Sequence, residues 1–99
     1  MSIVVATFWN WKPEVTEEKR NNLMKRGLEL AEKYDFKQLV LYASASAGTK
    51  YGYVNIAEYP NYAFLDKFQE IPELKNWLAE CLVNIKDVYR MILRTIPTP

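Results

Sequence analysis

The order of apolar patterns along the chain constrains its fold more than any other feature. The 99 residues divide into a strand, a long helix, two strands, a helical region and a final strand, with little sequence between them. Four strands in this order favour one antiparallel sheet with the first and third strands central and both helical regions on the same face. We therefore expect one α+β domain of βαββαβ order over residues 1–99.

The individual segments carry local signals for this order. Residues 3–11 (IVVATFWNW) are β-branched, apolar and aromatic, which predicts a buried strand. Thr16 predicts the N-cap of the first helix, because acidic residues follow it in the first turn. Gly27 lies in the apolar stripe of this helix, where glycine costs about 1 kcal/mol. We attribute it to close approach of the helix to the sheet.

The second half of the chain continues the pattern. Residues 36–45 and 51–59 alternate as strands around a small polar loop, with Val40 and Ala43 expected on opposite sides. The following helical region has two apolar stripes offset by about 100°. Pro72 lies at the offset and predicts a kink or two short helices. Residues 85–96 predict the last strand.

Composition excludes several classes of chemistry. The chain has no histidine, which removes histidine-activated nucleophiles and histidine-ligated zinc, haem or iron. Its one cysteine, Cys81, cannot form an intramolecular disulfide, and its neighbours Leu78 and Leu82 predict a buried, unreactive thiol. We expect no metal and no other cofactor.

Charge and hydropathy bear on partners and location. The net charge of +1 gives no general attraction to nucleic acid or to anionic lipid. The sequence has no charged-then-apolar leader and no apolar run approaching about 18 residues. We expect a cytoplasmic protein with no membrane partner.

The sheet face that the helices leave uncovered predicts self-association. The first, second and last strands carry large apolar groups on both sides, whereas two helices can shield only one face of a sheet. The apolar area left over would exceed what soluble monomers usually expose. We therefore expect a two-fold homodimer through this face, covering Tyr42, Tyr53 and Val88 or their strand neighbours.

Four segments carry a resemblance to a known superfamily: IVVATFWNW, YGYVNIAEY before Pro60, the broken FLDKFQEIPELKNWL helix and KDVYRMILRTI. In the order of its elements and the residue types within them, the chain resembles the dimeric α/β-barrel superfamily of ferredoxin-like subunits, in its antibiotic-biosynthesis-monooxygenase-like or uncharacterised branch. The resemblance implies dimers that pair sheet to sheet. Members include cofactor-independent quinol oxygenases, haem-degrading oxygenases, isomerases and small-molecule sensing domains.

The haem-degrading members use an asparagine, a tryptophan and a histidine. Asn10 and Trp77 would match the first two, but no histidine is present to bind iron. Away from haem, the Asn10 amide would orient a phenol or carbonyl in an aromatic pocket, or serve only as a polar residue near a turn. Trp77 would be a ligand platform or part of the core.

Further candidates lie on the strands. Tyr53 and Asn55, with Tyr42, would supply polar groups to a cavity or lie at the subunit interface. Arg90 stands between apolar residues of its face, so we expect it to be partly buried and paired with Glu58 or with a ligand carboxylate. No two carboxylates have a spacing that identifies an acid/base pair, so no catalytic residue is assigned.

These residues support several functional hypotheses. The first is a small-molecule site between sheet and helices, used by a cofactor-independent monooxygenase or isomerase acting on an aromatic or phenolic compound, with Asn10, Tyr53, Trp77 and Arg90 binding the ligand. The alternative is a non-catalytic ligand-sensing or structural dimer module. A minor alternative is RNA binding, because residues 50–54 (KYGYV) resemble the third-strand motif of RNA-recognition domains, whose aromatic side chains stack bases.

Overall fold

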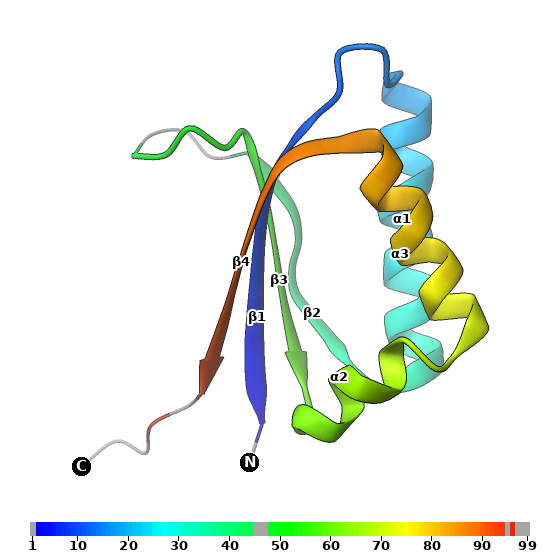
Figure 1. Cartoon of the computed structure of the whole chain (residues 1–99), viewed down its shortest axis with the longest axis vertical. Coiled ribbons are helices and arrows are strands. Elements are labelled where there is room, and N and C mark those ends of the chain that lie inside the picture. The colour runs from blue at the N-terminus through cyan, green and yellow to red at the C-terminus, as the bar shows by residue number, and fades with distance from the viewer. Residues whose placement is uncertain (1, 45–47, 95, 97–99) are drawn as a thin grey trace.

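The computed structural model describes residues 2–44, 48–94 and 96, and its elements follow the expected order. They are β1 (Ile3–Trp11), α1 (Glu17–Tyr34), β2 (Lys37–Ser44), β3 (Tyr53–Tyr59), α2 (Tyr62–Phe68), α3 (Pro72–Asn84) and β4 (Ile85–Arg94). The strands form one antiparallel sheet in the order β2-β3-β1-β4. Figure 1 shows the three helices on one side of this sheet. The predicted architecture, with β1 and β3 central, is confirmed.

Local sequence determines where the helices begin. The Thr16 hydroxyl accepts a hydrogen bond from the Lys19 backbone N–H at 3.2 Å, which confirms the predicted N-cap of α1. Asn61 caps α2 in the same way, accepting from the Phe64 N–H at 3.0 Å. Pro72 is the first residue of α3, a position that needs no N–H donor. The expected break in the second helical region is therefore confirmed.

Two register shifts in β2 overturn part of the expected strand pattern. Val40 lies opposite Ile56 and Ala43 lies opposite Val54, so Val40 and Ala43 share the face of the sheet that points away from the helices. Each shift adds a residue to β2 without a partner in β3, which reverses the alternation. The prediction that these two side chains lie on opposite sides is therefore wrong. Ala45 of the predicted strand lies outside the described residues.

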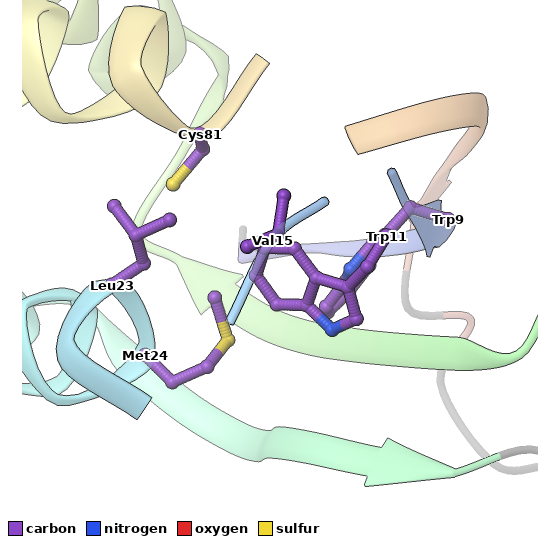
Figure 2. Close-up of a cluster of buried hydrophobic side chains, with 6 residues drawn as sticks. All are labelled: Trp9, Trp11, Val15, Leu23, Met24 and Cys81. Atoms are coloured by element: carbon purple, nitrogen blue, oxygen red, sulfur yellow. The ribbon is translucent and has the colours of Figure 1, made fainter. Parts of the chain in front are cut away.

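The core lies between the sheet and the helices in two clusters. The first joins the end of β1 to α1 and α3 and is drawn in Figure 2: Trp9, Trp11, Val15, Leu23, Met24 and Cys81. The second lies under α2 and the other end of α1: Leu30, Ala31, Phe36, Ala57, Phe68 and Leu74. Both clusters hold the helices over β1 and β3.

Gly27 makes its close contact with another helix and not with the sheet. A Cβ atom at Gly27 would lie 2.8 Å from Cζ2 of Trp77 on α3, too close for any side chain. The Trp77 indole N–H donates to the Leu23 carbonyl of α1 at 3.0 Å. The expectation of close approach to the sheet is corrected: glycine is needed because the ring edge of Trp77 contacts α1 at this position.

The side chains named for the dimer face lie on the helix-facing side. Trp11 Nε1 donates to the Tyr42 hydroxyl at 3.1 Å, and the rings of Tyr42 and Tyr53 stack with centroids 5.4 Å apart. Val88 lines the space between sheet and helices. The strand neighbours that lie on the helix-free face are Ala43, Val54 and Tyr89.

Candidate functional site

A cleft of about 590 Å³ lies between the sheet and the helices. Residues of all four strands and all three helices line it. The exposed lining residues belong to β4, α2 and the end of α3, so the mouth opens along the β4 edge of the molecule. The volume is within the range of about 300–1,000 Å³ that is usual for small-molecule sites.

Four polar side chains form a row across the floor of the cleft. In the strand register Thr7 of β1 lies between Asn55 of β3 and Arg90 of β4. Asn55 Nδ2 extends the row to β2 by donating to Gln38 Oε1 at 2.8 Å, and it also donates to the Leu41 carbonyl at 2.8 Å. All four side chains of this polar row line the cleft.

Apolar residues border the polar row on both sides. Trp9 and Tyr53 form the next rung of the sheet in one direction, and Val5, Ala57 and Ile92 form it in the other. Polar groups in such surroundings are costly unless they are hydrogen-bonded. The floor therefore suits a ligand that is mostly apolar and carries one hydrogen-bonding group.

Arg90 does not pair with Glu58. Glu58 lies opposite Val4 on the helix-free face, where it accepts from the Ser2 hydroxyl at 3.2 Å and lies 4.0 Å from Lys37 Nζ. The Glu58 hypothesis is therefore wrong, because the two side chains leave the sheet in opposite directions. Within residues 2–44, 48–94 and 96, no ion pair or hydrogen bond holds the Arg90 guanidinium.

Arg90 is also more exposed than expected. No helix covers β4 at this point, so the side chain lies at the mouth of the cleft. Its charge acts on Tyr59, another lining residue. Burial raises the pKa of the Tyr59 hydroxyl to about 12, and Arg90 acts in the opposite direction. Tyr59 therefore remains protonated near neutral pH and can donate a hydrogen bond.

Two other side chains that line the cleft, those of Cys81 and Trp9, are buried and chemically unreactive near neutral pH. The predicted burial of Cys81 is confirmed, and that burial raises the pKa of its thiol to about 12, which disfavours the reactive thiolate. The Trp9 side chain is 3% exposed, and its indole N–H has no acceptor among the described residues. Neither group is a nucleophile or a base at neutral pH.

The structure brings two of the four predicted ligand-binding residues together. Trp77 and Arg90 both line the cleft, from α3 and β4 respectively. Tyr53 lies beside it in an aromatic stack with Trp9, with ring centroids 6.1 Å apart. Asn10 is one of the even-numbered residues of β1, whose side chains point away from the helices. Tyr53 therefore supports the floor, and Asn10 is not near the cleft.

Asn10 has a structural set of partners. Its Oδ1 accepts from the Gly52 N–H at 2.7 Å, and its Nδ2 donates to Asp87 Oδ2 and to the Lys50 carbonyl, both at 3.3 Å. These bonds tie the approach to β3 to the beginning of β4. They also bend the chain at Gly52, so β3 begins at Tyr53 and not at Tyr51 as the sequence predicts.

The bend at Gly52 separates the two tyrosines of the RNA-recognition-like motif. Tyr51 stacks on Tyr89 with centroids 5.9 Å apart and lies near Phe8, on the helix-free face. Tyr53 packs on the opposite, helix-facing side. The two rings therefore do not form one base-stacking surface, so the pair of tyrosines on which the RNA-binding alternative rests is not brought together.

The sequence reasoning missed three members of the site. Thr7, Gln38 and Tyr59 line the cleft but were not candidates. Thr7 carried a usable signal, because it is polar in the inward phase of an otherwise apolar strand. Gln38 becomes inward-facing through the β2 register, which no local pattern indicates.

Comparisons with solved structures establish the fold. A hydroxynitrile lyase from Passiflora edulis has a TM-score of 0.78 at 8% identity, covering 99% of this chain and 97% of that one. A dimeric ferredoxin-like protein of unknown function from Jannaschia has a TM-score of 0.76 at 11% identity, covering 96% and 100%. A dabb family protein with a ferredoxin-like fold from Mesorhizobium loti has a TM-score of 0.74 at 10% identity, covering 97% and 98%.

The predicted ferredoxin-like fold is therefore confirmed over nearly the whole chain. No protein-family model and no curated protein matches the sequence. Within the described residues, no group of three or more potential metal ligands comes together, and no helix is long and apolar enough to cross a membrane.

Proposed function

We propose that this chain is a homodimeric small-molecule-binding protein whose ligand occupies the cleft between the sheet and the helices. The observation that carries the proposal is the polar row of Gln38, Asn55, Thr7 and Arg90 on the floor of an otherwise apolar cleft. Arg90 is exposed at the mouth of the cleft and has no ion pair within the described residues, so its charge is free to act on a ligand. A few placed polar groups in an apolar pocket are what orients a ligand in such a site.

The homodimer is proposed from the helix-free face. Tyr89 and Leu93 of β4 point to this face and are 48% and 49% exposed. Their register partners Phe8 and Val4 are also apolar, so the exposed surface continues across β1. A second copy presents the same surface, and a two-fold axis makes the contact self-complementary. The Jannaschia structure, which shares the fold, is described as dimeric.

The walls of the cleft favour an aromatic ligand. Trp9, Trp11, Phe68 and Trp77 line it from β1, α2 and α3. Indole and phenyl rings bind planar ligands by offset stacking or edge-to-face contact, which adds about 0.5–1.5 kcal/mol per ring pair. An aromatic or phenolic compound is therefore the proposed occupant.

A fluorescence titration tests cleft binding. We expect the neutral dye N-phenyl-1-naphthylamine to bind the purified protein with increased emission. Leu82→Trp should weaken binding about tenfold, since Leu82 lines the mouth of the cleft and is half-exposed. Val83→Trp is the matched control, because Val83 is 64% exposed and does not line the cleft. An absence of dye binding, or equal effects of both substitutions, would reject the proposal.

A second candidate function is catalysis in the same cleft, by a cofactor-independent monooxygenase or an isomerase. It is favoured by Tyr59 and Arg90, which can together stabilise a phenolate or enolate through a hydroxyl donor and a positive charge. A hydroxynitrile lyase shares the fold. Oxygen uptake with a panel of quinols, and isomer analysis of the products, would detect turnover. Binding without turnover would leave the non-catalytic module.

A further inference from the structure

We propose that the ligand is a planar aromatic carboxylate whose carboxylate is bound at the Arg90 and Thr7 end of the polar row. The inference rests on the proposed cleft-binding function and names its ligand class. It follows from three properties of the cleft: its unpaired cation, the direction of its hydrogen-bonding groups and the shape of its apolar walls.

Arg90 supplies the charge. Arg90 and Asp66 are the charged side chains that line the cleft, and no ion pair joins them within the described part of the chain. Asp66 belongs to the exposed surface of α2, whereas Arg90 projects from the floor beside Thr7. A guanidinium presents parallel N–H donors that match the two oxygens of a carboxylate.

The direction of the hydrogen bonds places the anion at one end of the row. Both N–H groups of Asn55 are directed to Gln38 Oε1 and the Leu41 carbonyl, so this side chain offers only its Oδ1 acceptor to the cleft. An acceptor repels a carboxylate. Gln38 retains its neutral Nε2 donor, but the positive charge is at the other end, where Arg90 is a cation, the Thr7 hydroxyl beside it can donate, and the protonated Tyr59 hydroxyl is a further donor in the cleft.

The apolar side chains around the cleft favour a ligand with a flat, apolar ring system. Trp77 lines the cleft and is only partly buried, so its indole is available to a planar ligand, whereas Trp9, which also lines the cleft, is 3% exposed and offers little of its surface. A cavity of about 590 Å³ has room for a ligand with two fused rings. Lysine would bind a hydrated anion at the surface equally well, but arginine beside aromatic walls suits an anion attached to a ring.

The test compares 2-naphthoate with 2-naphthamide, which has the same shape without the charge. We expect the full-length protein to bind 2-naphthoate at least about tenfold more tightly at pH 7. Arg90→Met should remove this difference and leave the affinity for 2-naphthamide unchanged, because methionine retains much of the apolar stem. Arg90→Lys, which keeps the charge but not the planar fork, should retain only part of the difference.

Lys25→Met is the matched control. It removes one positive charge from the exposed surface of α1, away from the cleft, and should leave both affinities unchanged. A thermal melt of each variant checks that it is folded, which we expect for Arg90→Met because the side chain is exposed and unpaired.

The outcomes separate this inference from the function on which it rests. Equal affinities for 2-naphthoate and 2-naphthamide, or a preference that survives Arg90→Met, would overturn the carboxylate assignment while leaving cleft binding intact. Binding of N-phenyl-1-naphthylamine without binding of either naphthalene would do the same. If none of the three compounds binds, the proposed function fails together with the inference.

Discussion

Two neighbouring strands that both carry large apolar residues on both sides have opposite environments in this fold. β1 and β4 both alternate large apolar residues on their two sides, and they are hydrogen-bonded along nearly their whole length. In β1 five of the nine residues are buried and none is exposed. In β4 none of the ten is buried and eight are exposed. The apolar residues alone do not distinguish the two strands, but β4 also carries four charged residues where β1 has none: Lys86, Asp87, Arg90 and Arg94.

The difference indicates what covers each strand. β1 is central, so α1 and α3 pack on one side of it and neighbouring strands flank both edges. β4 is an edge strand that follows α3 directly, and at its other end the Arg94 guanidinium lies 5.9 Å from the ring centroid of Tyr62 on α2. Between these two ends its residues are mostly exposed, and Figure 1 shows the strand at the side of the sheet away from the helices. Val88 and Ile92 face the cleft, and Tyr89 and Leu93 face the helix-free side, all 45–49% exposed. An apolar strand in this state fits a ligand on one face and a second subunit on the other.

The largest expected effect comes from removing the same side chain from each strand. Ile3→Ala in β1 should lower the free energy of unfolding by about 2–5 kcal/mol, because Ile3 is 1% exposed and the substitution leaves a cavity. Ile92→Ala in β4 should cost less than about 1 kcal/mol, because Ile92 is 45% exposed. Urea unfolding at equal protein concentration measures both.

The same two variants, measured with ligand present, test whether the cleft side of β4 is covered by the ligand. Ile92 lines the cleft, so saturating 2-naphthoate should increase the loss of unfolding free energy caused by Ile92→Ala. The loss caused by Ile3→Ala should be unchanged. Equal costs in the ligand-free protein would mean that β4 is already covered, and the contrast between the strands would be wrong.

The second effect concerns the helix-free face. Met91 lies opposite Ala6 on this face, so Met91→Asp would place a carboxylate within the proposed dimer contact. We expect the dimer dissociation constant to rise at least about 100-fold, because an unpaired charge is costly to bury. Sedimentation velocity between 1 and 100 µM is the measurement, over a range suited to an interface of more than about 1,000 Å².

Val83→Asp controls for the added charge. Val83 is 64% exposed on α3, and its substitution should leave the sedimentation coefficient unchanged. A wild-type monomer over the whole range, or a Met91→Asp protein that remains dimeric, would show that this face is not the contact.

The contrast between β1 and β4 also shows how far sequence reasoning reaches. The elements, the break at Pro72 and the central position of β1 follow from periodicity and capping, which are local properties. Whether Arg90 pairs with Glu58 cannot be predicted from such local properties, because the face that Glu58 occupies depends on the pairing between β1 and β3. Asn10 seemed functional between two tryptophans, yet its bonds to the Gly52 region join segments far apart in the sequence.

The cleft residues illustrate the same limit. Arg90 is predictable as a charge between apolar residues of its own strand, and Trp77 follows from the resemblance and from its place on an apolar helix stripe. Thr7 has a local signal too, as a polar residue in the inward phase of an apolar strand, whereas Gln38 is part of the site only through the register of β2 against β3. The sequence therefore predicts which faces are apolar, whereas pairing decides which polar groups meet on them.

A smaller effect should follow from the contact that positions the helices over β1. Gly27→Ala gains about 1 kcal/mol of helix propensity, but its Cβ would lie 2.8 Å from Trp77 Cζ2. The indole cannot move freely, because its N–H is bonded to the Leu23 carbonyl. We expect a net loss of about 1 kcal/mol in the free energy of unfolding.

A double-mutant cycle isolates this contact. In a Trp77→Phe background the clashing ring edge is absent, so Gly27→Ala should become neutral or stabilising. An equal loss in both backgrounds would mean that Gly27 is required for another reason, and that the contact does not position α3.

The smallest expected effect is a pH-dependent contribution from the ion pairs that also join α3 to α1. Glu80 Oε1 lies 2.6 Å from Lys19 Nζ, and Glu80 Oε2 lies 2.7 Å from Arg26 Nη1. The hydrogen bonds from Lys19 and then Arg26 lower the pKa of Glu80 from its ordinary value of 4.5. The folded state therefore holds this proton less tightly than the unfolded state does.

The direction of the pH dependence follows from this shift. A carboxylate whose pKa is lowered on folding stabilises the protein above its unfolded pKa and loses that contribution as the pH falls through the folded value. Because the three side chains are 31–41% exposed, we expect only about 0.5–1 kcal/mol at pH 7. Glu80→Gln should thus be destabilising at pH 7 and equal to wild type once the pH is below the folded pKa.

Urea unfolding of wild type and Glu80→Gln from pH 7 to pH 2.5 would measure this loss. Glu32→Gln is the control, since Glu32 is exposed on α1 and forms no ion pair within the described residues. A difference between wild type and Glu80→Gln that did not shrink with acid would mean that Glu80 acts by packing rather than by charge. α3 would then be held against α1 by Trp77, the apolar clusters and the Lys33–Glu73 ion pair, with no contribution from the charge of Glu80.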